Sequence, residues 1–242
     1  MLKELFFFKI RFINVKNNNL KLLIKTGGLF LFPAGPALAD LKINSLYYKA
    51  LIKADYVFFD SGYFVILLKI LKNIKVDKFS GYKFLKFLFK YLKHNKKNNI
   101  FVVDPSIKSM KLNKNFFNNK IKINSTHYVS PIYMKNNIND KKLLKKIKLL
   151  SPKVILINLG GGVQEIIGDY LISNLNYKPS IICTGAAISF FTGEQAPINN
   201  FFDKLFLGWL IRILFNPKIF LPRYLMSFKL FFLVLRNQVF IK

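Results

Sequence analysis

Five short, uninterrupted apolar runs alternate with longer amphipathic segments, and this alternation restricts the fold more than any other feature of the chain. The runs lie at 28–32, 56–59, 100–103, 154–159 and 180–183. A strand that is apolar at every position needs cover on both faces of its sheet, which helices provide in parallel sheets. The sequence therefore predicts an α/β fold, a Rossmann-like and mostly parallel sheet with helices on both faces.

The amphipathic segments predict helices between these strands. In 81–94, apolar residues recur at helical spacing while lysines occupy most of the opposite face. The predicted helices span about 44–54, 63–73, 81–94, 140–150, 164–175 and 203–215. The polar, Asn- and Lys-rich stretch 105–127 lacks such a pattern, so we expect a loop region there with at most one short strand.

The chain changes character near Pro197. Residues 197–242 hold seven basic residues and one acid among apolar and aromatic side chains, and Pro217 and Pro222 break any single long helix. This composition is typical of two or three short basic amphipathic helices at an anionic interface, or of an ordinary helix pair packed on the domain. We predict a Rossmann-like domain over 1–196 and a membrane-associating helical appendage over 197–242.

The formal net charge is +28, from 39 Lys and Arg against 11 Asp and Glu. Such a charge attracts polyanions, whether nucleic acid, anionic lipid headgroups or a phosphorylated substrate. No RNP-like string or zinc-finger pattern supports a nucleic-acid partner. No stretch reaches the ~18 apolar residues of a spanning helix, and no signal peptide is recognised, so we expect a cytoplasmic protein peripheral to the membrane.

Patterns for metals and nucleophiles are not found in the sequence. Cys183 is the only cysteine, which excludes an intrachain disulfide and a cysteine-based zinc site. His94 and His127 form no metal pattern, His127 has no obvious partner, and no Ser/His/Asp set is identifiable. No DxD-like pair is present to hold a metal on a nucleotide sugar. We therefore expect neither a cofactor nor a metal.

Three loops follow predicted strands, and ligands of open parallel sheets bind beyond the carboxyl ends of the strands. Asp60-Ser61-Gly62 offers a carboxylate that can act as a general base on a sugar hydroxyl, or else caps the next helix. The loop from Gly160 to Glu165 exposes backbone N–H groups to a phosphate, or forms a tight strand–helix turn. The third loop, Thr184 to Ser189, also allows close approach of a ligand.

Four motifs occur in a fixed order: ADYVFFDSGY (54–63), DKFSGYKFL (77–85), ILINLGGGVQE (155–165) and the string from Gly185 to Leu225. In this order they resemble glycosyltransferases of the WecG/TagA/CpsF family over about residues 28–240. The matching residues are Ala54, Asp55, Asp60, Lys78 (an Arg in the family), Gly81, Gly160, Gln164, Glu165, Gly185, Gly193, Ala196, Pro197, Trp209, Arg212, Pro217, Arg223 and Tyr224.

The resemblance implies transfer of an N-acetylmannosamine-type sugar from a UDP-sugar donor to a polyprenyl-diphosphate-linked acceptor in cell-surface polysaccharide synthesis. It implies an inverting, metal-independent reaction with Asp60 as the base, on the inner face of the plasma membrane. It also implies that the appendage binds the membrane and completes the active site. The residues expected to bind substrate are Ser61, Gly62, Lys78, Gly81, Gly160, Gly161, Gln164, Glu165, Gly185, Ser189, Arg212 and Arg223.

Two alternatives to an enzyme stay open at this point. The Phe-Asp of the family's glycine-rich turn is Ile188-Ser189 here, and this lost acid favours a non-catalytic, membrane-bound relative in a glycan-assembly complex. The net charge favours a nucleic-acid-binding protein, which would bind RNA or DNA in a salt-dependent way. A homo-oligomer is compatible with the sequence.

Overall fold

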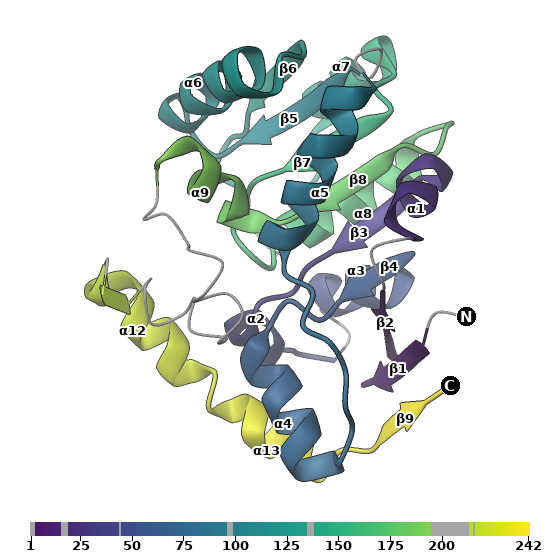
Figure 1. Ribbon diagram of the computed structural model, residues 1–242, viewed down its shortest axis with the longest axis vertical. Helices are drawn as coiled ribbons and strands as arrows, with labels where there is room; N and C mark the ends of the chain where they lie inside the picture. The colour runs from purple at the N-terminus through teal and green to yellow at the C-terminus, as the bar shows by residue number, and fades with distance from the viewer. Residues whose placement is uncertain are drawn as a thin grey trace.

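A nine-stranded sheet forms the centre of the computed structural model (Figure 1). Its strands are β1 Lys3–Phe7, β2 Ile10–Asn14, β3 Gly28–Leu31, β4 Tyr56–Phe58, β5 Ile100–Asp104, β6 Ser125–Val129, β7 Val154–Ile157, β8 Ser180–Cys183 and β9 Val239–Ile241. Their order is β6-β5-β7-β8-β3-β4-β2-β1-β9. All pairs from β6 to β2 are parallel, whereas β1 and β9 pair antiparallel at one edge. The predicted Rossmann-like α/β fold is confirmed.

Helices follow most of the parallel strands. They are α1 Leu20–Thr26, α2 Gly35–Ala39, α3 Leu46–Lys53, α4 Gly62–Lys72, α5 Gly81–His94, α6 Ile107–Phe116, α7 Lys141–Leu150, α8 Gln164–Asn174, α9 Ser189–Thr192, α12 Pro217–Met226 and α13 Lys229–Arg236, with a π turn η2 at Phe117–Ile121 and a 3₁₀ turn η3 at Gly185–Ile188. The five predicted strands and the first five predicted helices are confirmed.

The structure describes residues 3–15, 19–43, 45–95, 99–134, 138–194, 213–214 and 216–242, without the side chains of residues 219, 220 and 223. The predicted helix at 203–215 therefore lies almost wholly outside the described residues. In the described ranges, no helix is both long enough and apolar enough to span a bilayer.

Two hydrophobic cores lie on opposite faces of the sheet. Successive strand residues alternate between them, as Leu29 and Phe30 of β3 do. One core packs against α1, α5 and η2, and the other against α2, α3, α4, α7, α8 and α13. Because both faces are covered, β3, β5, β7 and β8 are buried at every position, which explains why their sequences are almost entirely apolar.

Serine residues set the start of four helices. Ser45, Ser61, Ser80 and Ser106 precede α3, α4, α5 and α6, and each hydroxyl accepts a hydrogen bond from the backbone N–H three residues later. Such caps satisfy N–H groups that have no partner within the helix, and each contributes about 1 kcal/mol. Three of these helices, α4, α5 and α6, follow β4 and β5, whereas α3 precedes β4.

The stretch 105–127 is not the loop region that we predicted, because α6, η2 and the start of β6 occupy it. The amphipathic signal of α6 is weak since polar side chains take buried positions. Asn113 is 1% exposed and donates to the Asp104 Oδ1 at 2.6 Å. A polar residue at a buried position has the sequence signature of a surface residue, which accounts for the error.

The C-terminal segment returns to the domain. Leu230 and Val234 of α13 are completely buried, and α13 packs against α4 and α2. Lys72 Nζ donates to the Leu235 carbonyl oxygen at 3.1 Å, near the end of α13 where carbonyls lack helical partners. Beyond α13, β9 pairs with β1, so the two ends of the described chain lie side by side (Figure 1).

The two prolines that we expected to break a long helix in this segment occupy different positions in α12. Pro217 begins α12, as a proline at a first helical position can. Pro222, however, lies inside α12 and does not end it. The break that separates α12 from α13 falls at Ser227 and Phe228.

Candidate functional site

The carboxyl end of β3 is surrounded by loops that the sequence analysis singled out. Asp60 Oδ1 accepts a hydrogen bond from the Gly81 N–H at 2.8 Å. A Cβ added to Gly81 would lie 3.1 Å from the Thr184 Cβ. The next residue, Gly185, donates its N–H to Gln164 Oε1 at 2.7 Å. These contacts join the loops after β4, β7 and β8 with the start of α5.

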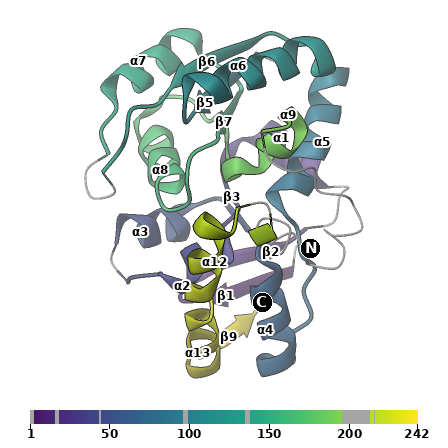
Figure 2. The ribbon, with the colours of Figure 1, turned by 90° about the vertical axis from the view of Figure 1, so that its left-hand side faces the viewer.

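Helix α2, which directly follows β3, contacts two of these loops. A Cβ added to Gly161 would lie 3.6 Å from the Ala37 Cβ, and one added to Gly35 would lie 2.9 Å from the Ser61 Oγ. We call this set of segments the loop ring: Asp60–Ser61, Gly81, Gly160–Gln164, Thr184–Gly185 and α2. In Figure 2 the viewer faces the side of the molecule where α2 and α9 lie.

Asp60 is a partly buried carboxylate held at the end of β4. Its N–H bonds the Phe58 carbonyl oxygen at 3.0 Å, and the Phe79 N–H bonds the Phe59 carbonyl oxygen at 2.9 Å. The second bond draws the stretch with Lys78 and Gly81 alongside Asp60. Of the two capping candidates, Ser61 caps α4, because its hydroxyl accepts the Phe64 N–H at 3.2 Å. The Asp60 carboxylate therefore lies at the end of β4 without serving as the N-cap of α4.

The glycine-rich loop rests on two buried side chains. Glu165 is 1% exposed, and its carboxylate accepts from the Gly162 N–H at 2.7 Å and from Gln164 Nε2 at 3.1 Å. Burial raises the pKa of the Tyr47 phenol well above its usual value, and the negative charge of Glu165 raises it further. Gln164 and Glu165 therefore lie beneath the loop, whereas nothing within 4 Å would obstruct a Cβ at Gly160.

Two polar residues follow neighbouring strands: Asn158, which the sequence analysis missed, and Thr184, which begins the third predicted loop. Asn158 follows β7 and Thr184 follows β8, and they are 4% and 8% exposed. Within the described part of the chain, both polar atoms of the Asn158 side chain and the Thr184 Oγ1 have no hydrogen-bond partner. Asn158 falls inside the apolar run 154–159, which concealed it as a candidate. Thr184 belongs to the loop ring, and Asn158 precedes its segment Gly160–Gln164 by two residues.

A Ser/His/Asp set does exist, contrary to our expectation for His127. His127 Nδ1 is 2.6 Å from Asp104 Oδ2, and His127 Nε2 is 2.9 Å from Ser125 Oγ. Because an ionised carboxylate only accepts, Nδ1 donates to Asp104 and Nε2 accepts from the serine hydroxyl. Ser125 begins β6, at the edge of the sheet opposite the loop ring, whereas Asp104 ends β5 at the same edge as the loop ring. The set joins β6 and α6 to β5, and none of its residues belongs to the segments of the loop ring.

Other predicted residues lie at the border of the site or beyond it. Ser189 begins α9, and its hydroxyl donates to Glu194 Oε2 at 3.3 Å, while Ser109 donates to Glu194 Oε1 at 2.9 Å. Arg212 lies outside the described residues, and of Arg223 only the backbone, in α12, is described.

The appendage nevertheless reaches the loop ring. A Cβ added to Gly35 would lie 3.7 Å from the Oγ of Ser227, at the junction of α12 and α13. Helix α12 also packs against α2.

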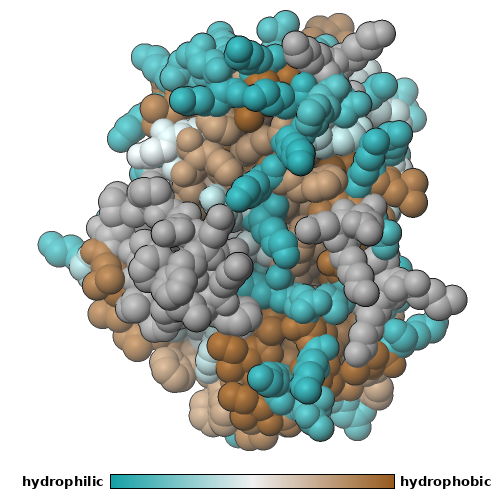
Figure 3. All heavy atoms as spheres, viewed as in Figure 1, coloured by the Kyte–Doolittle hydropathy of each residue, from teal (hydrophilic) through white to brown (hydrophobic). Residues whose placement is uncertain are grey.

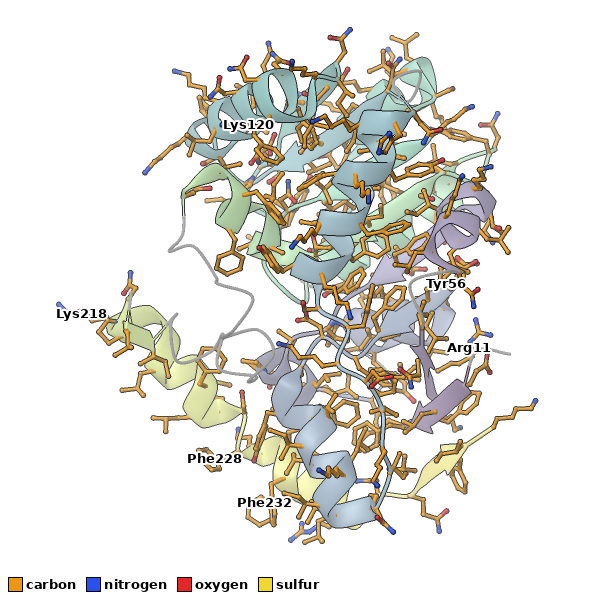
Figure 4. All side chains as sticks on the ribbon, viewed as in Figure 1. Arg11, Tyr56, Lys120, Lys218, Phe228 and Phe232 are labelled. Atoms are coloured by element: carbon orange, nitrogen blue, oxygen red, sulfur yellow. The ribbon has the colours of Figure 1, made fainter. Side chains whose placement is uncertain are left out.

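Asp55 shares its sequence motif with Asp60 but lies at the amino ends of the strands. Its Oδ2 accepts the Leu29 N–H at 2.9 Å, its Oδ1 accepts Lys178 Nζ at 2.6 Å, and its carbonyl oxygen accepts Arg11 Nη2 at 2.8 Å. Figure 4 shows Arg11 and the neighbouring Tyr56 on the side away from α12. These bonds hold β2, β3 and β4 together, so Asp55 has a structural role.

A further polar cluster follows β6. Asp140 caps α7 by accepting the Leu143 N–H at 2.8 Å, and it accepts the phenols of Tyr128 and Tyr133 at 2.8 and 2.6 Å. Burial by itself raises the pKa of Asp140, but the hydrogen bonds from Tyr133, Leu143 and Tyr128 outweigh burial and hold this pKa below its usual value. Burial and the bond to Asp140 raise the pKa of Tyr128 to about 12.

No group of three or more His, Cys, Asp and Glu side chains suited to a metal occurs among the residues that the structure describes. In the comparison with protein families, the model described as the glycosyl transferase WecG/TagA/CpsF family matches residues 9–242. Among the curated proteins, none matches this chain significantly.

Proposed function

The chain belongs to the WecG/TagA/CpsF glycosyl transferase family, and on that premise we propose that it moves an N-acetylmannosamine-type sugar from a UDP-sugar to a polyprenyl-diphosphate-linked acceptor. Because it belongs to this family, the chain is a glycosyltransferase of cell-surface polysaccharide synthesis. Members of the family generally use a sugar-nucleotide donor and a lipid-linked acceptor. The loop ring carries the finer proposal, because it gathers an acidic side chain and open backbone N–H groups at the end of β3.

Asp60 is the general base of the proposed reaction. As the acceptor hydroxyl oxygen forms a bond to the anomeric carbon, the bond from that carbon to the UDP oxygen breaks on the opposite face. The hydroxyl proton goes to Asp60, UDP leaves with the bonding electron pair, and the anomeric configuration inverts. The bond from the Gly81 N–H fixes one carboxylate oxygen, which leaves the carboxylate orientation set before the acceptor binds.

The donor is proposed to bind at the Gly160–Gln164 segment of the loop ring. Gly160 and Gly161 offer close approach to backbone N–H groups near the start of α8, where a phosphate is favoured. Gln164 and Glu165 support this loop from below and orient Gly162 and Gly185. The further residues of the proposed donor site are Ser61, Gly62, Gly81 and Ser189. Lys78, Arg212 and Arg223 are proposed to offset the charge of the leaving diphosphate, without any metal.

The appendage, residues 197–242, is proposed to hold the domain 1–196 on the inner face of the plasma membrane. Its described helices carry exposed apolar side chains together with basic ones and no acid. Since the junction of α12 and α13 adjoins Gly35, docking of the appendage on a bilayer places the loop ring close to a lipid-linked acceptor.

The test is a thermal-shift panel of nucleotide sugars on the purified full-length chain, followed by transfer of radiolabelled sugar to a polyprenyl-diphosphate sugar. We expect stabilisation by UDP-sugars and a lipid-linked product whose anomeric configuration is inverted. If calorimetry detects no binding of any UDP-sugar, the proposal fails. That result would favour the non-catalytic scaffold suggested by Ile188-Ser189 in place of the family's Phe-Asp.

A further inference from the structure

A surface groove on α4 combines two cations with an apolar lining, on the Rossmann-like domain and apart from the appendage. The groove has a volume of about 480 Å³ and is lined by Val65, Ile66, Lys69, Lys75 and Val76. Lys69 lies in the last turn of α4, and Lys75 follows the left-handed Asn73 that ends this helix. The chain reversal at Asn73 brings the second lysine back against the first.

The two lysines of the groove are unpaired within the described part of the chain. Neither ammonium group has a hydrogen bond or ion pair there, whereas the neighbouring Lys72 is bonded to α13. Helix α4 and the residues up to Val76 contain no acid; the nearest acids in sequence are Asp60 before the helix and the exposed Asp77 after the groove. The groove is therefore an uncompensated cationic site that complements an anion.

Exposed apolar side chains lie on α4 and on the helix packed against it. Ile66 is 38% exposed and Ile70, one turn further, is 72% exposed. On the adjoining α13, Phe232 and Leu235 are 54% and 48% exposed, and Phe228 just before that helix is 64% exposed. Figure 3 shows apolar side chains over α4 at the lower end of the molecule, crossed by hydrophilic side chains. Figure 4 shows Phe228 and Phe232 projecting outward at the same end.

We propose that this groove binds the phosphate of an anionic phospholipid in the bilayer, with Lys69 and Lys75 at the headgroup and Ile66 and Ile70 in the acyl boundary. This inference rests on the proposed docking of the appendage at a membrane, and it adds a second contact supplied by the domain itself. Cations among aliphatic side chains match a lipid interface, because lysine stems lie along apolar surface while their ammonium groups reach the headgroups.

The composition of the groove argues against nucleic acid as its occupant. Single-stranded nucleic acid is held by aromatic side chains on which bases stack, between basic residues that follow the backbone. The groove residues are aliphatic or basic, and none is aromatic. Because Lys72 joins α4 to α13, a lipid bound at the groove also fixes the orientation of the appendage over the loop ring.

The experiment compares two double variants of the full-length chain that remove the same charge. Lys69→Gln with Lys75→Gln alters the groove, and Lys86→Gln with Lys90→Gln alters exposed lysines of α5, on the other face of the sheet. Partitioning is measured by flotation with mixed phosphatidylglycerol–phosphatidylcholine vesicles and with pure phosphatidylcholine vesicles. A basic residue at an anionic surface contributes roughly fivefold, so we expect about a 25-fold lower partition coefficient for the groove variant and less than about twofold for the control.

Transfer to a water-soluble acceptor analogue should be unchanged in the groove variant, since the groove lies outside the loop ring. Equal loss of vesicle binding in both variants would overturn the headgroup site while leaving membrane docking intact. Failure of the unaltered chain to bind the anionic vesicles would overturn membrane docking itself. The lipid assignment would also fail if single-stranded RNA bound the unaltered chain and lost affinity only in the groove variant.

Discussion

Replacement of Glu165 by Gln changes one buried oxygen to an amide nitrogen beneath the glycine-rich loop. The carboxylate accepts hydrogen bonds from the Gly162 N–H at 2.7 Å and from Gln164 Nε2 at 3.1 Å. A glutamine at this position has one oxygen and one NH2 group. Since both partners are donors, one of them must face another donor in the variant.

The cost follows from the bond that is lost. A hydrogen bond to a charged group contributes about 1.5–3 kcal/mol, and Glu165 is only 1% exposed, so water cannot replace the missing acceptor. Removal of a buried charge offsets part of the loss. We therefore expect Glu165→Gln to lower the free energy of unfolding by about 2 kcal/mol. For a chain of this length that corresponds to a fall in melting temperature of about 4–8 °C.

Urea denaturation measures the change, and calorimetry with a UDP-sugar measures its effect on donor binding. We expect a lower denaturation midpoint at an unchanged slope, together with weaker donor binding because Gly162 is no longer held. Glu194→Gln is the matched control. Its partners are the hydroxyls of Ser109 and Ser189, which can turn to accept, so its stability should change by less than about 0.5 kcal/mol. Weaker donor binding at unchanged stability would refute the supporting role of Glu165.

Two further predictions concern polar groups outside the loop ring. Asp104→Ala leaves two buried donors, His127 Nδ1 and Asn113 Nδ2, without their acceptor. At about 1–3 kcal/mol for each unsatisfied donor, it should lower the free energy of unfolding by about 2–6 kcal/mol in urea titrations, and a loss below about 1 kcal/mol would contradict this. Asp140→Asn keeps an N-cap but loses the charge to which Tyr133 donates. The pKa of Asp140 is lower in the folded than in the unfolded state. The ionised side chain therefore stabilises the fold fully at pH values above the unfolded pKa, and this stabilisation is lost as the pH falls through the folded pKa. The stability gap between wild type and variant should persist from about pH 7 to about pH 5 and close below about pH 4; a constant gap would contradict the assignment.

The sequence predicted those elements whose pattern is local. Helix α5 matched its prediction at both ends, since Ser80 caps one end and apolar residues recur along its length. The buried strands matched because cover on both faces makes most of their positions apolar; Asp104 of β5 and Ser180 of β8 are the buried polar residues of these strands. Strand β9 was missed because three residues, Val239–Ile241, carry no pattern and are specified by pairing with β1 at the other end of the chain.

The hairpin of β1 and β2 was missed for a different reason. Its turn places Phe8 and Lys9 at φ values of 50° and 61°, where glycine or asparagine is usual, so the turn has no sequence signature. His127 seemed to lack a partner since Asp104 becomes its neighbour only when β5 and β6 pair in register. The loop ring was easier to anticipate, because the carboxyl ends of parallel strands necessarily lie at one edge of the sheet.

The most direct test of the proposed base is sugar transfer by Asp60→Asn, beside Asp77→Asn as a control at an exposed acid in the same region. The asparagine oxygen can still accept the Gly81 N–H, so folding and UDP binding should be retained. Loss of a general base should lower the transfer rate about 10²–10⁴-fold, with no comparable loss in the control. Transfer by Asp60→Asn within about threefold of wild type, at unchanged UDP affinity, would contradict the assignment of Asp60 as the base.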